Sequence, residues 1–255
     1  MIKLLKYDFI YLWRTYKFLI FPAVAVLFAF VSPLTAKYIN ELLALLTSTT
    51  GGDPLITLPD PTILDSYGQY VSNLYEIFLI VGIFVSVSIF MRDKNKGLLP
   101  LILSKPINRT KYLLSKFISL SILILVSLML GYFVFSYYTF FVFDKVDMLG
   151  MFLVSILFFV YVIFILAISL FSAVFFNSYL VAVSTTFAIY IITSMLTIFE
   201  VSIFKYLPGV ISSNSVNILI GEEIILDVIL NVGVTLLISF VFIYFAVNRF
   251  KKQNI

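Results

Sequence analysis

The stretch MRDKNKGLLPLILSKPINRTKYLLSK, residues 91–116, interrupts a chain that is apolar over most of its length. It contains seven Lys and Arg residues and a single acid, Asp93. Its centre, GLLPLILSKP at residues 97–106, is apolar enough to be buried but far shorter than the roughly 20 residues that cross a membrane. A basic segment with a short apolar centre therefore stands between two segments that are each long enough to span a bilayer.

The composition of the whole chain excludes a soluble domain. Of its 255 residues, 62% are hydrophobic and only 12% are charged, with a mean hydropathy of +1.12. Soluble domains are about 45–50% apolar and about 25% charged. The chain has no Cys and no His, which excludes disulfides, thiolate metal sites and histidine-based catalysis. We therefore expect neither an enzyme nor a cofactor or metal bound by this chain.

Six apolar segments are long enough to be membrane spans. Together they predict an all-α integral membrane protein in which residues 1–255 form a single transmembrane domain. The six predicted spans cover residues 18–36, 71–91, 117–143, 148–176, 179–199 and 224–247.

The charges on the connecting segments predict the orientation, because Lys and Arg are retained on the cytoplasmic side. With both termini placed in the cytoplasm, 14 of the 17 Lys and Arg residues are cytoplasmic, and among the 13 acids only Asp8 and Asp93 are. This asymmetry predicts a multi-pass protein of the cell (plasma) membrane. The basic residues are expected to meet anionic lipid headgroups, and no nucleic-acid partner is expected.

Residues 1–17 precede the first span and have the pattern of an amphipathic helix. At 100° per residue, four basic residues fall within an arc of about 80°, and four apolar or aromatic residues lie opposite. We predict an interfacial helix with its apolar side toward the acyl chains; the alternative is a first span that simply begins early. The basic set is Lys3, Lys6, Arg14 and Lys17, and the opposite set is Leu5, Phe9, Leu12 and Tyr16.

The predicted spans contain almost no ionisable side chains, and Ser and Thr supply most of their polarity. Glu76, about two turns from the outer end of the second span, either binds a cation or reaches water and headgroups. The absence of a chain of buried acids, Lys or His excludes a proton relay, and the sequence has no G-x-x-x-x-G-K-[ST] phosphate loop. Energy for uphill transport must therefore come from a separate chain.

Residues 92–116 have the features of a short helix between two bends. Gly97 breaks the helix that leaves the second span, Pro100 suits the first turn of a new helix, and Pro106 ends it. Such a helix, apolar on one side and basic on the other, would lie across the cytoplasmic end of the bundle. It can dock into a groove on a soluble partner, or it can be a re-entrant or interfacial segment that only contacts lipid.

The order of motifs in this stretch resembles the membrane subunit of type 2 ABC transporters. After the charged cluster come a glycine, a leucine-rich run, S-x-P-I-x-R, and then Y-L-L-x-K at the start of the third span. One departure is Lys96, where the family often has Glu, and another is the outer loop 37–70, which is longer than in many relatives. The residues that match the pattern are Gly97, Pro106, Ile107, Arg109, Tyr112 and Lys116.

The resemblance implies that residues 92–116 hold the coupling helix that seats in an ATPase subunit. The chain would then pair with an ABC ATPase, which binds ATP and Mg, and with a second copy of itself or a homologous permease. The coupling residues that the resemblance implies are Arg92, Asp93, Lys94, Gly97, Leu98, Leu101, Pro106 and Arg109.

The resemblance also assigns a role to residues 200–223, between the fifth and sixth spans. Two apolar pieces here are separated by Pro208, Gly209 and the polar sequence SSNS. Relatives form a re-entrant hairpin that closes the outer end of the pathway, so the implied outer gate is Pro208, Gly209 and Glu222. The alternative is an ordinary ordered loop.

Together these features predict the permease subunit of an ATP-driven ABC transporter, an exporter that forms its pathway as a dimer. Two other classes stay open: a six-span membrane protein with an assembly role that needs no ATPase, and a secondary transporter or channel. The scarcity of charge within the spans argues against ion coupling and ion conduction. The substrate stays open as well, because an apolar pathway is compatible with lipids, drugs and hydrophobic peptides.

Overall fold

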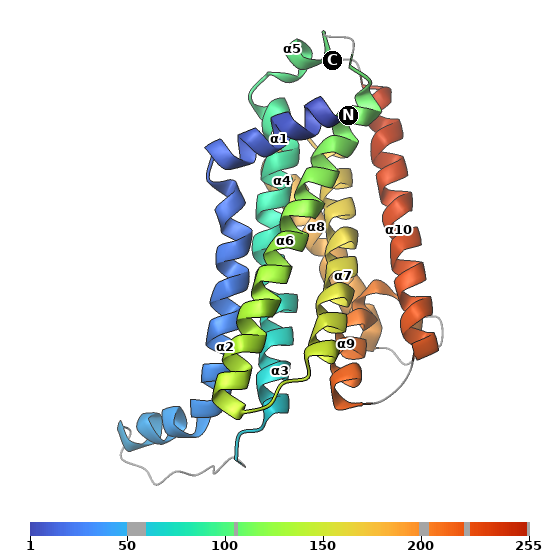
Figure 1. The fold of residues 1–255 in the computed structure, drawn as a ribbon. Helices are drawn as coiled ribbons and strands as arrows, with labels where there is room; N and C mark the ends of the chain where they lie inside the picture. Colours follow the sequence, from blue (N-terminus) through green and yellow to red (C-terminus); the bar gives the residue numbers. More distant parts are fainter. Residues whose placement is uncertain (50–59, 105–106, 199–203, 222–224, 254–255) are drawn as a thin grey trace.

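The protein is an elongated bundle in which the long helices run along the long axis, from one end to the other (Figure 1). The computed structural model describes residues 1–49, 60–104, 107–198, 204–221 and 225–253, and over these residues it contains helices and no strand. The elements are α1 Ile2–Arg14, α2 Lys17–Thr49, α3 Ile63–Asn73, η1 Leu74–Phe78, α4 Leu79–Asn95, α5 Leu99–Leu103, α6 Arg109–Phe143, α7 Met148–Phe175, α8 Tyr179–Met195, η2 Leu196–Ile198, η3 Phe204–Tyr206, η4 Pro208–Val210, α9 Ile211–Ile220 and α10 Ile225–Lys251.

Five helices are long and apolar enough to cross a membrane, so the prediction of a multi-pass all-α membrane protein is confirmed. They are Lys17–Glu41 of α2, the continuous helix Ile63–Asn95 formed by α3, η1 and α4, and the helices α6, α7 and α10. The fifth predicted span, residues 179–199, corresponds to α8, an apolar helix of only 17 residues. Helices α3 and α6 begin several residues before the apolar segments that predict their spans. They begin at polar capping residues, and the capping residue does not coincide with the start of the apolar segment.

The helix ends are fixed by short polar side chains. Thr62 and Asp65 form a reciprocal capping box at the start of α3. Asn108 caps α6 through the backbone N–H of Thr110, and Asp147 caps α7 through that of Gly150. These residues set where the chain enters the bundle at each end.

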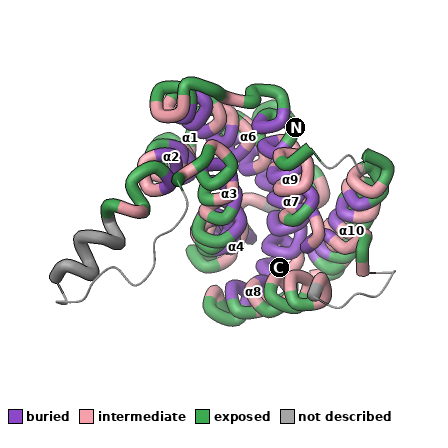
Figure 2. Tube along the Cα trace, turned by 90° about the horizontal axis from the view of Figure 1, so that it is seen from below, coloured by how far each residue is buried: buried purple, intermediate pink, exposed green. Residues whose placement is uncertain are grey.

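Helix α7 lies at the centre of the bundle. In its most apolar stretch 72% of the residues are buried, against 17% in α10, which therefore presents most of its apolar surface outward. Aromatic rings fill the contact between α7 and the α3–α4 helix: Phe158 packs edge-on against Tyr75 and against Phe78. Figure 2 shows the buried residues concentrated around α7, with α8 and α10 more exposed at the periphery.

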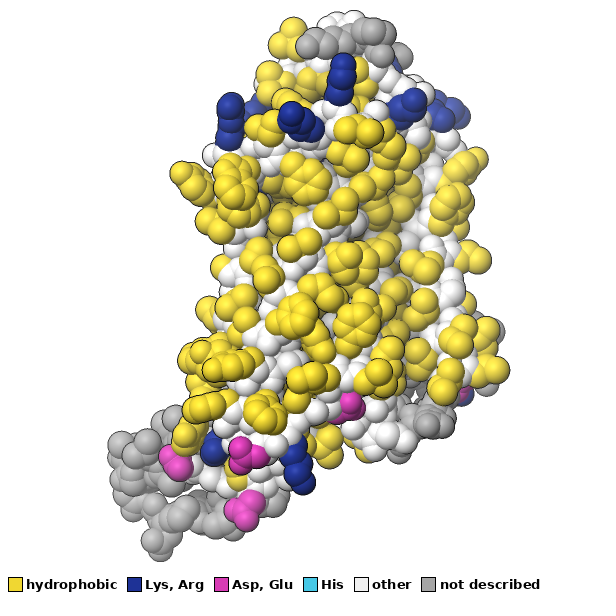
Figure 3. Space-filling view, viewed as in Figure 1, with side chains coloured by type: hydrophobic (Ala, Val, Ile, Leu, Met, Phe, Trp, Pro, Cys, Tyr) yellow, Lys and Arg dark blue, Asp and Glu magenta, His cyan; other side chains and the backbone are white. Residues whose placement is uncertain are grey.

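The outer surface divides into a broad apolar middle and two charged ends. On the face seen in Figure 3, hydrophobic side chains cover the middle, most Lys and Arg gather at the end that carries α1, and the acids lie at the opposite end. Both chain termini lie at the basic end (Figure 1). We call this the basic end and the opposite one the acidic end.

Helix α1 is separate from α2 and crosses the basic end of the bundle (Figure 1). The chain turns at Thr15 and Tyr16, where Tyr16 has a left-handed φ of 55°. On the predicted apolar side of this helix Leu12 is buried in the bundle, whereas Phe9 and Tyr16 are exposed; the interfacial position itself stays a prediction. The side of α1 that faces the bundle also contains the buried Asp8, whose carboxylate accepts a hydrogen bond from Ser115 of α6. Lys17, predicted on the basic side, begins α2 and donates to Ser88 Oγ at 2.8 Å.

Candidate functional site

The segment that follows α4 folds as the sequence predicts. Gly97 has φ +64°, a left-handed conformation that glycine adopts at little cost, and it ends α4. The chain turns back through a hydrogen bond from Leu98 N–H to Asp93 O at 2.9 Å. Helix α5 then begins with Pro100 in its first turn. Pro106, predicted to end this helix, lies outside the described residues.

The exposed face of α5 is apolar. Leu99 is buried against the bundle, Leu98 is half-buried, and Leu101 is 67% exposed beside the exposed Pro100. No basic residue occurs within α5 itself, so the expectation of a basic outer side is wrong for its described residues. A short helix that carries an exposed leucine is a surface suited to a hydrophobic pocket on a partner.

A cluster of buried charges lies directly behind α5. Asp93 is fully buried and forms ion pairs with Arg92 and with Lys116, the latter at 2.7 Å between Nζ and Oδ2. The hydroxyl of Tyr112 also donates to Asp93 Oδ2. Arg92 and Lys116 are themselves 7% and 2% exposed. Of the predicted coupling residues, Asp93 therefore joins α4 to α6 and Arg92 joins α4 to Tyr7 of α1, and both are buried.

The same cluster holds α1 in place. Ser115 Oγ donates to Asp8 Oδ2 at 2.8 Å, and the Arg92 guanidinium lies over the ring of Tyr11 at 3.7 Å from its centroid. Burial raises the pKa of the Asp8 carboxyl above its ordinary value of 3.8, although the bond from Ser115 and the charges of Lys116 and Arg92 oppose this shift. Three helices distant in sequence thus meet at one polar cluster.

Two other predicted coupling residues bind the carboxyl ends of neighbouring helices. Lys94 Nζ donates to Phe176 O, just after α7, at 2.8 Å. Arg109 Nη1 donates to Lys251 O at 3.1 Å and to Gln253 O at 2.7 Å, at the end of α10. Cations are favoured there because the last carbonyls of a helix have no intrahelical partner.

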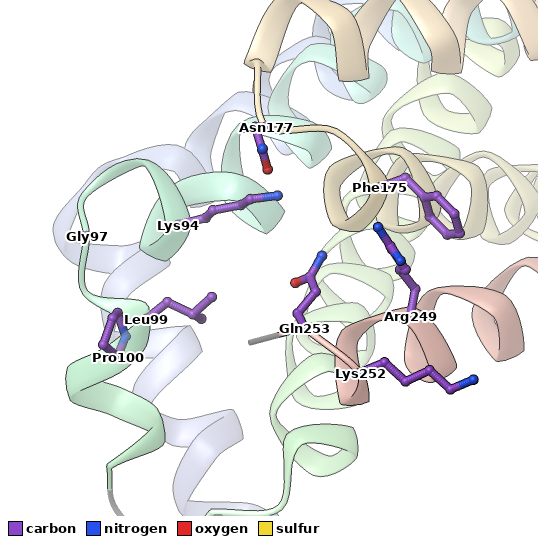
Figure 4. Close-up of a pocket in the computed structure, with 9 residues that line it drawn as sticks. All are labelled: Lys94, Gly97, Leu99, Pro100, Phe175, Asn177, Arg249, Lys252 and Gln253. Atoms are coloured by element: carbon purple, nitrogen blue, oxygen red, sulfur yellow. The ribbon is translucent and has the colours of Figure 1, made fainter. Parts of the chain in front are cut away.

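A cavity of about 550 Å³ opens at the basic end, between α5, the α7–α8 turn and the end of α10. Figure 4 shows its lining residues. They are Lys94, Gly97, Leu99, Pro100, Phe175, Asn177, Arg249, Lys252 and Gln253.

At the acidic end, Pro208 and Gly209 form η4 and lead into α9. A Cβ atom on Gly209 would lie 2.7 Å from Thr193 O and from Thr197 Cγ2, so only glycine permits this approach to α8. Helix α9 packs against α7 and α3. The third residue of the predicted outer gate, Glu222, lies outside the described residues.

A second cavity, of about 400 Å³, lies between η1, α8 and α9. Glu76 lines it from the π-helical turn η1, together with the rings of Tyr75, Tyr161 and Tyr190. Tyr190 Oη donates to Tyr75 O at 3.0 Å, and the Tyr75 hydroxyl is 3.2 Å from Ser215 Oγ. Glu76 thus faces a polar cavity.

Two residues that make contacts between helices at the basic end are not predicted as site residues. Asp8 accepts a hydrogen bond from Ser115, and the Gln253 side-chain amide donates to Val174 O at 2.9 Å. Asp8 carries a signal, since it is one of only two acids on the basic side. Nothing in the sequence around Gln253 indicates its contact. Within the described part of the chain, no group of three or more His, Cys, Asp or Glu side chains is arranged to hold a metal ion.

Comparison with known proteins identifies the family. The model of the ABC-2 family transporter proteins matches residues 3–208, which is well over half of the chain. The match covers α1, the buried cluster, α5 and the chain as far as Pro208. A comparison with curated proteins gives no match.

Proposed function

This chain belongs to the ABC-2 family of transporter proteins, and from this premise we propose that it is the permease of an exporter driven by a separate ATPase. The observation that carries the proposal is the construction of residues 92–116. An exposed apolar helix, α5, stands at the basic end on a buried cluster of charges that reaches α1, α4 and α6. ATP and Mg would be bound by the ATPase chain alone.

In this proposal the chain crosses the membrane six times. Helix α8 supplies the sixth crossing, because together with η2 it approaches the roughly 20 residues that a span needs. The basic end with both termini then faces the cytoplasm. Helix α1 lies in the interface, where the exposed Ile2 and Trp13 would contact lipid and the exposed Lys3, Lys6 and Arg14 would meet headgroups and water.

In the coupling step, the ATPase displaces α5, and the contacts at the basic end pass this displacement on to the neighbouring helices. Buried ion pairs are costly to separate, so Asp93, Arg92 and Lys116 move α4 and α6 together. Lys94 carries the movement to the α7–α8 turn, and Arg109 carries it to α10. Closure of the ATPase pair would thereby rearrange the spans as a body.

The pathway forms between two permease subunits, this chain and a second copy or a homologue. Its outer end is closed by η4 and α9, with Pro208 and Gly209 at the bend and Glu222 beyond. The support for a gate is the close approach of Gly209 to α8 and the polar cavity beside it. Export follows if opening of this end releases cargo to the outside.

The proposal is tested by purification of the tagged chain from its natural membrane. We expect an ABC ATPase to remain bound in gentle detergent, and Leu101→Asp to abolish its retention because a charge enters the apolar contact. Leu226→Asp is the matched control, since Leu226 is 71% exposed at the opposite end. Equal retention by the two variants, or wild-type chain that purifies without an ATPase, would contradict the proposal and favour an ATPase-independent role.

A further inference from the structure

Among the described residues, the cavity at the basic end concentrates positive charge without an acid in its lining. Three of its lining residues are cations, Lys94, Arg249 and Lys252, and none of its lining residues is an acid. In the described part of the chain the carboxylates within 4.0 Å of a basic group belong to other pairs, those of Asp93 and Asp227. The charge in this cavity is therefore available to a ligand.

Two of the three cations extend into the cavity from different helices. In Figure 4 the amino group of Lys94 and the guanidinium of Arg249 extend into the space between α4 and α10, with the amide of Gln253 between them, whereas Lys252 extends away. Lys94 uses one of its three donors on Phe176 O, and Gln253 uses its amide nitrogen on Val174 O. The Arg249 guanidinium lies 5.8 Å from the ring centroid of Phe175, and none of the ion pairs among the described residues includes Arg249.

Two cationic groups that line a cavity of about 550 Å³ match the chemistry of a phosphate. Arg binds phosphate through two parallel N–H bonds, and Lys binds it as a point charge. The side-chain amide of Asn177, at the α7–α8 turn, adds a further donor to the lining.

The residues around the cavity indicate what kind of molecule carries that phosphate. Phe175 is 38% exposed, and on the first turn of α8 the side chains of Leu180 and Val181 are 70% and 45% exposed. An apolar surface therefore adjoins the cations at the level where the membrane-crossing helices end. Basic pockets of this kind between membrane helices hold lipid headgroups. We propose that this cavity binds the phosphate of an anionic phospholipid, whose acyl chains lie along α8.

A lipid in this position would add one more link across the basic end. Its phosphate would bridge Lys94, behind α5, to Arg249 on α10. The assignment needs an anionic membrane lipid and no ATPase, so it can fail or succeed independently of the proposed function.

The test is native mass spectrometry of the purified chain in neutral detergent, titrated with phosphatidylglycerol. We expect one tightly retained phosphatidylglycerol and no equivalent retention of phosphatidylcholine. Arg249→Gln should weaken retention about fivefold, the effect of one positive charge near an anionic headgroup. Arg249→Lys should keep most of it. Lys251→Gln removes the same charge from an exposed neighbour outside the cavity and should leave retention nearly unchanged.

Each alternative has its own result. Equal loss in Arg249→Gln and Lys251→Gln would reduce the binding to general surface attraction and overturn the site. Displacement of phosphatidylglycerol by excess inorganic phosphate would assign the cavity to a soluble anion and overturn the lipid. Retention of a lipid only in the absence of a bound ATPase would assign the cations to acidic side chains of that partner. If Arg249→Gln lowers the yield, Lys94→Gln provides the second variant.

Discussion

The two ends of the bundle are held together in opposite ways. At the basic end, buried charges join helices that are far apart in sequence: Asp93 pairs with Arg92 and Lys116, and Arg109 binds the end of α10. At the acidic end, neutral hydrogen bonds and one close glycine contact hold α9, and the ion pair between Lys205 and Asp227 is exposed to solvent. In the proposed function, this contrast would let the basic end move as a unit while the acidic end separates.

The largest expected effect comes from breaking the buried cluster. Asp93→Asn removes the carboxylate that pairs with both Arg92 and Lys116, so we expect a loss of about 3–5 kcal/mol in the free energy of unfolding. Thermal unfolding of the purified variant measures it. Asp93→Asn combined with Lys116→Met removes one of the two cations and should recover part of the loss. A double variant no more stable than the single one would show that the cluster is not a unit.

The acidic end is tested by Gly209→Ala. The new methyl group would lie 2.7 Å from Thr193 O and Thr197 Cγ2, and overpacking of this kind costs about 1–3 kcal/mol. Gly233→Ala is the matched control, because a Cβ there meets nothing within 4 Å. We expect Gly209→Ala to lower thermal stability and transport while ATPase retention stays intact. Loss of the ATPase in this variant would mean that the two ends are not independent.

An intermediate effect is expected where the basic end reaches α10. Arg109→Glu removes a charged donor from the carbonyls of Lys251 and Gln253, and a hydrogen bond to a charged group is worth about 1.5–3 kcal/mol. Membrane insertion should be normal while stimulated ATPase activity loses its link to transport. Lys111→Glu makes the same charge change at an exposed position two residues on. The same uncoupling in both variants would point to general electrostatics.

The smallest effect is a pH dependence from Asp8. Its pKa is raised in the folded protein, so its contribution to stability is greatest at low pH and is lost as the pH rises through the raised pKa. Asp8→Asn, which imitates the protonated form, should therefore gain stability relative to wild type between acidic and neutral pH. Melting temperatures of both proteins across that range measure it. Asp60→Asn, an exposed change at the acidic end, is the control, and a pH-independent difference for Asp8→Asn would contradict the assignment.

The sequence predicts the local features of both ends and misses most of the contacts between helices. Hydropathy finds the five long spans, and the rules for Gly97 and Pro100 find the bend and start of α5. The bond between Ser115 and Asp8 joins residues 107 apart, and its existence depends on how α1 crosses α6. Residue spacing carries no information on such a crossing. The sequence likewise predicts Arg109 as a surface cation, because its spacing does not show that it reaches the carbonyls at the end of α10.

The central claim is that α5 is the contact between this permease and its ATPase, and cross-linking tests it most directly. Because the chain has no Cys, Leu101→Cys introduces a single thiol at the exposed position of α5. A reagent that couples to this thiol and carries a photoreactive group, applied to native membranes and illuminated, should join it to an ATP-binding chain, and Leu226→Cys at the opposite end should give no such product. Joining of an ATPase to both thiols, or to neither, would contradict the account.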